Sequence, residues 1–245
     1  MCIRDRSYEE RGLGSIINYT KLIMVRDDGV VQRLVVKRYR EWRALKWAPL
    51  ALWAGLGSEF STGPSERLAR EYYALLLLSS KGLPVPKPLY VDWSRRVMVR
   101  EYVEGETLSK LIARGEGLDV YESLGRVVGD VHALGLSLGD LRPCNVIVEK
   151  SSRKPFLIDL EQASTRRDKS WDIAELVAFT LIDTRYDVGF TKKLLGCFVM
   201  GYTSRMPFDV VLKAFSYRYM RILAPIAPPP LMLAVKKHVE RLVSA

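Results

Sequence analysis

The sequence predicts a two-lobed α+β fold, in which a small antiparallel sheet and one main helix form the first lobe and helices form most of the second. Runs of β-forming residues joined by turn signals dominate the chain before residue 104, whereas the chain after Gly105 has mainly the apolar spacing of helices. The 245 residues are 48% apolar, which is enough to fill a sizeable core. We therefore expect lobes at residues 8–103 and 104–245, with a hinge near residues 101–105.

The first lobe is expected to begin with a β-hairpin. Residues 16–25 and 30–39 are rich in β-forming side chains, and the Asp28-Gly29 pair between them is a good turn signal. An apolar, basic stretch follows at residues 41–57. Its three tryptophans either pack inside the protein or form a patch for a partner or a membrane surface.

One helix and two more strands complete the predicted first lobe. The helix begins near Ser65, with Glu66 in its first turn, and its apolar periodicity continues to Ser80. A proline-rich connection then leads to strands at residues 89–92 and 96–103, which are separated by a polar turn.

The second lobe is predicted to be mainly helical, with two short strands. Helices are expected at residues 107–113, 121–134, 198–202 and 208–222, and strands at residues 145–148 and 156–158. Prolines at positions 225 and 228–230 are expected to break the element that follows. The basic tail at residues 186–245 either completes this lobe or recognises a substrate.

The net charge and the cysteines indicate the kind of partner and the cellular compartment to expect. A net charge of +10 favours an anionic partner such as an RNA complex, an acidic protein or a membrane surface, and a generic basic surface is the alternative. Three widely spaced cysteines, Cys2, Cys144 and Cys197, argue against disulfide bonds and a zinc site and fit a reducing cytoplasm. The apolar stretches are too short for a transmembrane segment.

Three polar residues in the second lobe form the strongest chemical signal. Asn145 follows Asp140 by five positions on one expected loop, and Asp159 ends the next expected strand. Phosphoryl transfer needs such a set, because a carboxylate must accept the proton of the attacking hydroxyl and oxygen ligands must hold Mg²⁺ against the phosphates. We therefore identify Asp140 as the candidate base, and Asn145 and Asp159 as candidate metal ligands.

These residues give the sequence a resemblance to a known family. The spacing of Asp140 and Asn145 is that of the catalytic loop in protein kinases. The sequences at 139–141 and 158–159 resemble the motifs of two atypical groups, the RIO kinases and the small kinase of the KEOPS complex. Glu161 stands where ordinary protein kinases have the glycine of their D-F-G motif. The resemblance implies a protein-kinase-like fold that uses ATP and Mg²⁺.

Upstream residues extend the resemblance in the expected order. Lys37 ends a Val-Val-Lys run that is similar to the V-A-I-K strand of protein kinases, which implies a lysine that reaches the α and β phosphates. Glu71, on the predicted helix, is the implied ion-pair partner of Lys37. The interval between the two residues is long for an ordinary protein kinase and resembles that of RIO proteins.

Two further segments are matched to nucleotide binding. Gly12, Gly14 and Ser15 stand where a loop that covers the phosphates is expected, and a simple turn is the alternative. The sequence around Glu101 and Val103 resembles the hinge of the family. This resemblance implies that the backbone of these two residues binds the edge of the adenine ring.

Asp172 and His132 are interpreted as supports of the catalytic loop region. Asp172 is similar to an aspartate of the KEOPS kinase that opens a buried helix, and the resemblance implies that it braces the catalytic loop through backbone hydrogen bonds. No second histidine or cysteine stands at metal-binding spacing from His132, so we interpret it as structural. Because Asp172 follows Asp159 closely, we expect the peptide-docking segment of ordinary protein kinases to be missing.

Three hypotheses of function follow. The first is an ATP-dependent atypical kinase that phosphorylates a Ser or Thr hydroxyl on a protein. The second keeps the fold and changes the acceptor to a small molecule, a sugar or a lipid headgroup. The third is an ATPase that acts as a switch in an RNA-associated assembly, which the net charge of +10 would suit.

Overall fold

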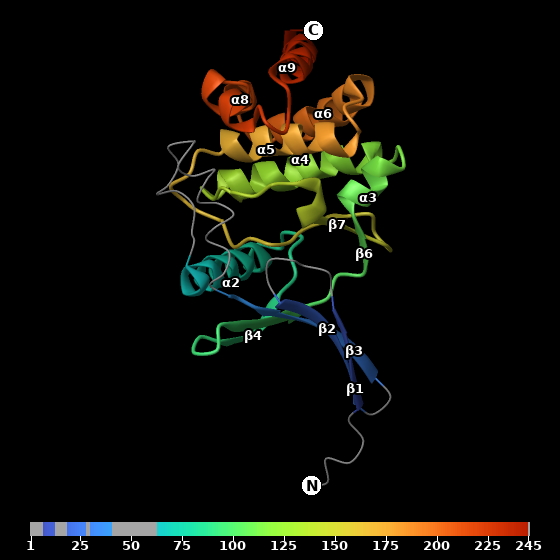
Figure 1. The fold of residues 1–245 in the computed structure, drawn as a ribbon, viewed down its shortest axis with the longest axis vertical. Coiled ribbons are helices and arrows are strands. Elements are labelled where there is room, and N and C mark those ends of the chain that lie inside the picture. The colour runs from blue at the N-terminus through green and yellow to red at the C-terminus, as the bar shows by residue number, and fades with distance from the viewer. Residues whose placement is uncertain (1–6, 13–18, 28–29, 41–62, 245) are drawn as a thin grey trace.

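The computed structural model describes residues 7–12, 19–27, 30–40 and 63–244. Figure 1 shows a lobe that combines a sheet with the helix α2 (Pro64–Ser80) and, next to it, a lobe that consists mostly of stacked helices. The predicted two-lobed α+β fold class is confirmed by this arrangement. The boundary between residues 103 and 104 stays a prediction.

The first lobe contains a five-stranded antiparallel sheet with the order β1-β2-β3-β5-β4. Its strands are β1 (Ser7–Gly12), β2 (Tyr19–Asp27), β3 (Val30–Arg38), β4 (Pro88–Asp92) and β5 (Val97–Glu101). Strand β1 is not predicted from the sequence, and its last residue, Gly12, pairs with Lys21. The other two residues assigned to the phosphate loop, Gly14 and Ser15, lie outside the described residues, as does the tryptophan-rich stretch at 41–57.

Strand alternation directs two cations to the buried face of this sheet. Val35 and Lys37 are buried on β3, and Met98 and Arg100 are buried on β5. The strand register pairs Val35 with Arg100 and Lys37 with Met98. Because side chains two positions apart share one face of a strand, Lys37 and Arg100 lie on the same face of the sheet.

Helix α2 begins and ends as its sequence dictates. Pro64 occupies the first turn, where the backbone N–H that proline lacks is not needed. The chain leaves the helix at Gly82 with a φ of +73°, a conformation that glycine adopts without strain. The buried face of the helix carries Leu68, Leu75 and Leu78, and it also carries the charged side chains of Arg67 and Glu71.

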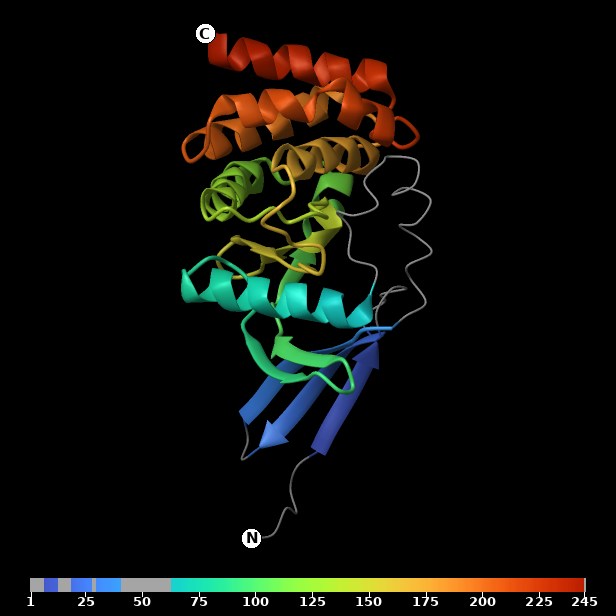
Figure 2. The same cartoon turned by 90° about the vertical axis from the view of Figure 1, so that its left-hand side faces the viewer.

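The second lobe combines helices with one small sheet. Its helices are α3 (Leu108–Ala113), α4 (Leu118–Ala133), α5 (Ser170–Asp183), α6 (Val188–Thr203), α7 (Phe208–Ala214), α8 (Tyr217–Leu223) and α9 (Pro229–Ser244). Its strands are β6 (Gly105–Thr107), β7 (Val146–Glu149) and β8 (Pro155–Leu157), and the 3-10 helix η2 (Pro143–Asn145) precedes β7. Residues 102–104 connect β5 to β6 and join the two lobes (Figure 2).

Close packing of α4 against α6 fixes the centre of the second lobe. A side-chain carbon at Gly125 would lie 2.1 Å from the backbone oxygen of Phe198, and one at Gly201 would lie 1.9 Å from that of Glu122. Only glycine allows two helix backbones to approach this closely. Helix α4 therefore presents a fixed support for the loop that follows it.

The tail completes the lobe, which is one of the two alternatives that the sequence left open. Helix α9 adds Met232, Val235 and Val239 to the buried core. The prolines at 229 and 230 begin this helix and do not break it, because proline fits the first turn. None of the described helices has the combined length and hydropathy that crossing a membrane requires.

Candidate active site

Lys37 lies at the centre of a buried cluster of charges between the two lobes. Its Nζ atom is 2.5 Å from Glu71 Oε2, 2.5 Å from Asp159 Oδ1 and 3.2 Å from Glu161 Oε2. Only 5% of Lys37 is exposed. Tyr39, two positions further along the chain, donates its hydroxyl proton to Glu71 Oε2 at 2.7 Å. The lysine thus connects the sheet, α2 and the segment that follows β8.

The carboxylates decide the protonation of this cluster. Burial favours a neutral lysine, but the charges of Asp159 and Glu71 outweigh burial and hold the pKa of Lys37 well above its usual value. Burial alone would raise the pKa of Asp159. The charge of the Lys37 ammonium outweighs burial, so the pKa of Asp159 lies below its usual value. Lys37 is therefore a fixed cation and Asp159 a fixed anion at neutral pH.

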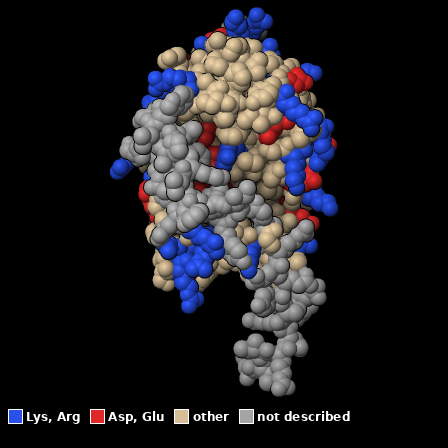
Figure 3. Space-filling view, viewed as in Figure 1, with Lys and Arg blue, Asp and Glu red and all other residues tan. Residues whose placement is uncertain are grey.

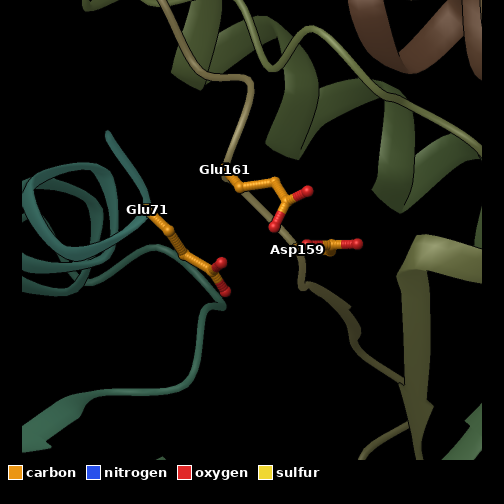
Figure 4. A group of neighbouring side chains, drawn as sticks. All are labelled: Glu71, Asp159 and Glu161. Carbon is orange, nitrogen blue, oxygen red and sulfur yellow. The ribbon is translucent and has the colours of Figure 1, made fainter. Parts of the chain in front are cut away.

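Three carboxylates gather around the lysine. Ligand oxygens of Glu71, Asp159 and Glu161 all lie within 4.8 Å of one another. Figure 4 shows Glu71 projecting from α2, with Asp159 and Glu161 projecting from the segment after β8 toward the same space. Such a set of oxygen atoms can hold a divalent cation. In the described structure, the Lys37 ammonium neutralises part of their charge.

Asp140 is held in place by its neighbours on the same loop. Arg142 Nη2 donates to Asp140 Oδ2 at 2.6 Å, and Arg142 Nε lies 2.5 Å from Asp140 Oδ1. Asn145 donates its amide N–H to the backbone oxygen of Asp140 at 2.9 Å and to Asp140 Oδ2 at 3.1 Å. The guanidinium of Arg142 lies over the ring of Phe179, 5.2 Å from its centre. These contacts fix the direction of the Asp140 carboxylate.

The environment of Asp140 weakens it as an acid. Burial raises the pKa of Asp140 to about 6, and the nearby charge of Asp159 adds to this rise, whereas the charge of Arg142 opposes it. A carboxylate with this pKa is ionised at pH 7 and is more basic than an exposed aspartate. It can therefore accept a proton from a hydroxyl group as that group reacts.

A hydrogen bond links the Asp159 segment to the Asp140 loop. The backbone N–H of Ile158 donates to the backbone oxygen of Asn145 at 2.9 Å, so Asp159 directly follows the point of contact. Asp159 has a φ of +61°, which lies in the left-handed region, and its side chain is 27% exposed. Asp140, Asn145 and Asp159 are therefore brought to one place, with oxygen atoms of the kind that Mg²⁺ prefers.

Asp172 anchors the backbone just before Asp140 through hydrogen bonds. Its Oδ2 and Oδ1 atoms accept the backbone N–H groups of Leu138 at 2.6 Å and Gly139 at 2.7 Å. Ser137 and His132 bind the same carboxylate through their side chains. These bonds have the form of the brace that the sequence resemblance implies. His132 is fully enclosed by protein contacts, as expected for a structural histidine.

The residues that the resemblance matches to the hinge lie in or next to the connection between the lobes, and Arg100 lies beside them. Glu101 ends β5, and Val103 follows in the connection between the lobes. Arg100 donates from Nη1 to the backbone oxygen of Glu101 at 3.2 Å, and its Nε atom has no hydrogen-bond partner among the described residues. The negative charges of Glu71 and Asp159 lie close enough to attract this buried guanidinium electrostatically. Arg100 is thus part of the site.

Some site residues are missed by sequence reasoning. Arg67 and Arg142 carry no motif of their own, although Arg67 lies one helical turn before Glu71 and could have been placed on the same face of α2. Glu161 is noticed in the sequence only as a departure from a glycine. The structure shows that this position needs no glycine, because the left-handed residue of the segment is Asp159.

Residues 65–174 match the RIO domain family. The chain is 35% identical over 97 residues to KEOPS complex subunit Bud32 of Pyrococcus abyssi, an alignment that covers 38% of this chain and 43% of that protein. It is 30% identical over 111 residues to 3-deoxy-D-manno-octulosonic acid kinase of Xylella fastidiosa strain 9a5c, an alignment that covers 42% of this chain and 44% of that protein. The chain thus spans less than half the length of these curated relatives.

A solved structure extends the likeness over nearly the whole chain. The crystal structure of aminoglycoside-3'-phosphotransferase of type VIII matches with a TM-score of 0.57 and 17% identity, and 95% of each chain is covered. This match shows the protein-kinase-like fold. Together, the RIO domain and the relatives support an atypical kinase-like family for this chain.

Proposed function

We propose that the chain is a kinase-type phosphotransferase that moves the γ-phosphate of ATP to a hydroxyl group. The observation that carries the proposal is the convergence of Asp140, Asn145 and Asp159 beside the Lys37–Glu71 ion pair. These residues come from both lobes and four separate parts of the chain: β3, α2, the loop of Asp140 and Asn145, and the segment after β8. Each has the chemical character that its position in phosphoryl transfer requires.

In this proposal, the buried residues position the phosphates. The Lys37 ammonium, held by Glu71, would donate hydrogen bonds to phosphate oxygens. Asp159 and Asn145 would hold Mg²⁺, which when bound offsets the negative charge that the phosphates carry. The backbone of Glu101 and Val103 would bind the adenine edge, and Gly12, Gly14 and Ser15 would cover the phosphates.

Asp140 acts on the acceptor. Its carboxylate accepts the proton of the acceptor hydroxyl, the hydroxyl oxygen bonds to the γ-phosphorus, and the bond from that phosphorus to its bridging oxygen breaks. ADP leaves with the electron pair of that bond. The contacts of Arg142 and Asn145 keep the carboxylate in one orientation, so most of the rate enhancement would come from positioning and electrostatics.

The acceptor we propose first is a Ser or Thr hydroxyl on a protein, because residues 65–174 match the RIO domain and the motifs resemble those of RIO kinases. A specific observation favours a small molecule as the second candidate. Only residues 160–169 separate Asp159 from α5, and this short connection offers little surface for docking a peptide. A sugar acceptor would agree with the name of the relative that is a 3-deoxy-D-manno-octulosonic acid kinase.

A switch function is the third candidate. Two of the relatives are described as a KEOPS complex subunit and a probable bifunctional tRNA threonylcarbamoyladenosine biosynthesis protein. Membership in an RNA-associated assembly would suit the net charge of +10, and Figure 3 shows Lys and Arg side chains on both lobes. A cytoplasmic location is part of the proposal, in keeping with the free thiols of Cys144 and Cys197.

The test is a transfer assay with γ-labelled ATP. Pools of proteins, sugars and lipids are incubated with the intact protein and with the Asp159→Ala variant, and labelled products are identified by mass spectrometry. Label on one pool that is lost with the variant would support transfer and identify the acceptor class. Release of labelled phosphate alone, together with a stable RNA-containing complex, would favour the switch. Absence of ATP binding and turnover would refute the proposed function.

A further inference from the structure

A second buried ion pair lies beside Lys37 and Glu71. Arg67 precedes Glu71 by one helical turn, so both side chains project from the same face of α2. Arg67 Nη1 donates to Glu161 Oε1 at 3.1 Å, and Arg67 Nη2 donates to the backbone oxygen of Arg40 at 2.6 Å. Glu161 is 4% exposed and Arg67 is 2% exposed. This pair anchors the segment after β8 to α2.

The two oxygens of Glu161 have different partners. While Oε1 binds Arg67, Oε2 lies 3.2 Å from Lys37 Nζ. Lys37 therefore has a carboxylate on each side, one from Glu71 on α2 and one from Glu161 on the segment after β8. Figure 4 shows the two carboxylates projecting toward the same space from these two elements.

The third contact of Lys37 conflicts with the proposed reaction. Lys37 Nζ and Asp159 Oδ1 lie 2.5 Å apart and neutralise each other. Phosphate binding needs an N–H group of Lys37, and metal binding needs the oxygen of Asp159. The Lys37 ammonium has three N–H groups, which face Glu71, Asp159 and Glu161, so a phosphate gains one only if one of these contacts opens. A metal bound to Asp159 draws this carboxylate away from Lys37, so the contact to Asp159 is the one that opens when the nucleotide and the metal bind. Lys37 then depends on its remaining carboxylates to keep its orientation.

We propose that Glu161 is a positioning residue, which holds Lys37 toward the phosphates after Asp159 has turned to the metal. The ion pair with Arg67 keeps Glu161 available for this role. A carboxylate that already binds a guanidinium competes less well with Asp159 for the metal. The proposal rests on the proposed function, since it assigns a part in the same site. It gives a reason for a glutamate at a position where ordinary protein kinases have glycine.

The first test measures the binding of Mg·ATP by calorimetry in the Glu161→Gln variant. Glutamine fills the same space but cannot hold both Arg67 and Lys37 through charged oxygens. We expect the Kd for Mg·ATP to rise about tenfold, as one charge-assisted hydrogen bond is lost. The Mg²⁺ concentration that gives half-maximal turnover should stay near the wild-type value, because Asp159 is intact. The Glu161→Asp variant should recover part of the affinity.

A paired variant separates positioning from simple structural support. The double variant Arg67→Met with Glu161→Leu keeps the side-chain volume of the buried pair and removes both charges. Its melting temperature should therefore be close to that of the wild type, unlike that of a variant that leaves one charge of the pair buried and unpaired. Lys37 still lacks its second carboxylate in this variant, and the raised Kd should therefore persist. Glu122→Gln, which changes an exposed ion pair on α4, serves as the matched control and should leave the Kd unchanged.

Two results would overturn the inference. One is an unchanged Kd in Glu161→Gln, and the other is a paired variant whose affinity recovers together with its stability. If the wild-type protein binds no Mg·ATP, the proposed function itself fails and this inference fails with it. If the wild type and Glu122→Gln both bind Mg·ATP and either overturning result is found, only the role of Glu161 is refuted and the proposed function stands.

Discussion

Replacing Asp140 by Asn should stabilise the protein at neutral pH while removing its activity. Burial raises the pKa of Asp140 from 3.8 to about 6. The folded protein therefore binds this proton more tightly than the unfolded chain does, and ionisation of Asp140 lowers stability. The difference of about 2 pH units corresponds to about 3 kcal/mol at pH 7 and above. Asparagine resembles the protonated side chain and cannot ionise, so it avoids this cost.

The same reasoning predicts how the effect depends on pH. The cost is absent below the unfolded pKa of 3.8, grows as the pH rises toward 6, and is constant above it. Asp140→Asn should thus raise the free energy of unfolding by up to about 3 kcal/mol at pH 7.5 and by little at pH 4. Arg142 loses its ionic partner, but its side chain is 20% exposed and can be hydrated.

Urea unfolding, followed by circular dichroism at both pH values, measures this effect. Asp119→Asn is the control, since it removes an exposed carboxylate that pairs with Arg153 and should change stability by less than about 0.5 kcal/mol. Phosphate transfer should fall by at least about a hundredfold in Asp140→Asn, as expected for loss of a general base. A variant that is less stable than the wild type at pH 7.5, or equally stabilised at both pH values, would refute the reasoning.

Three further predictions concern the loop that carries Asp140 and Arg100 on β5. The rate of transfer should fall as the pH drops through about 6, where Asp140 becomes protonated. Arg142→Gln should move this fall to higher pH, because it removes the positive charge that lowers the pKa of Asp140. A pH–rate profile of each protein measures both effects. Arg100→Met should lower the KM for ATP in steady-state kinetics, since Arg100 occupies the backbone oxygen of Glu101 that adenine would use. Gly139→Ala should lower stability by about 2 kcal/mol or more in thermal unfolding, because φ is +78° and the added carbon would lie 1.7 Å from a buried guanidinium nitrogen.

Local patterns explain why much of the fold and the centre of the site could be predicted. The alternation of a strand and the period of a helix depend on near neighbours, so residues 30–38 and 64–80 were recognised from their own sequences. The spacing between Asp140 and Asn145 is likewise local. Lys37 and Glu71 could be assigned only because the resemblance supplied their order, since an isolated lysine or glutamate on a surface means little.

The parts that were missed depend on contacts between distant segments or on backbone pairing alone. The bond between Arg67 and Glu161 joins residues that are 94 positions apart, and no sequence pattern announces it. Strand β1 has the sequence SYEERG, which lacks alternating apolar residues, and it was missed because an edge strand can be held mainly by backbone hydrogen bonds to its neighbour. Arg100 directly precedes the segment that resembles the hinge and carries no motif of its own, yet the register of β5 directs it into the site.

The charges of the site argue that metal and nucleotide enter it together. Lys37 and Asp159 neutralise each other in a largely buried place, so separating them removes one counter-charge from Lys37 and leaves Asp159 without its cation unless both find new partners. A cation alone would satisfy Asp159 but would add positive charge next to Lys37. A phosphate alone would satisfy Lys37 but would leave Asp159 beside another anion. Mg·ATP supplies both partners at once, and the carboxylates of Glu71 and Glu161 then keep Lys37 from following Asp159 toward the metal.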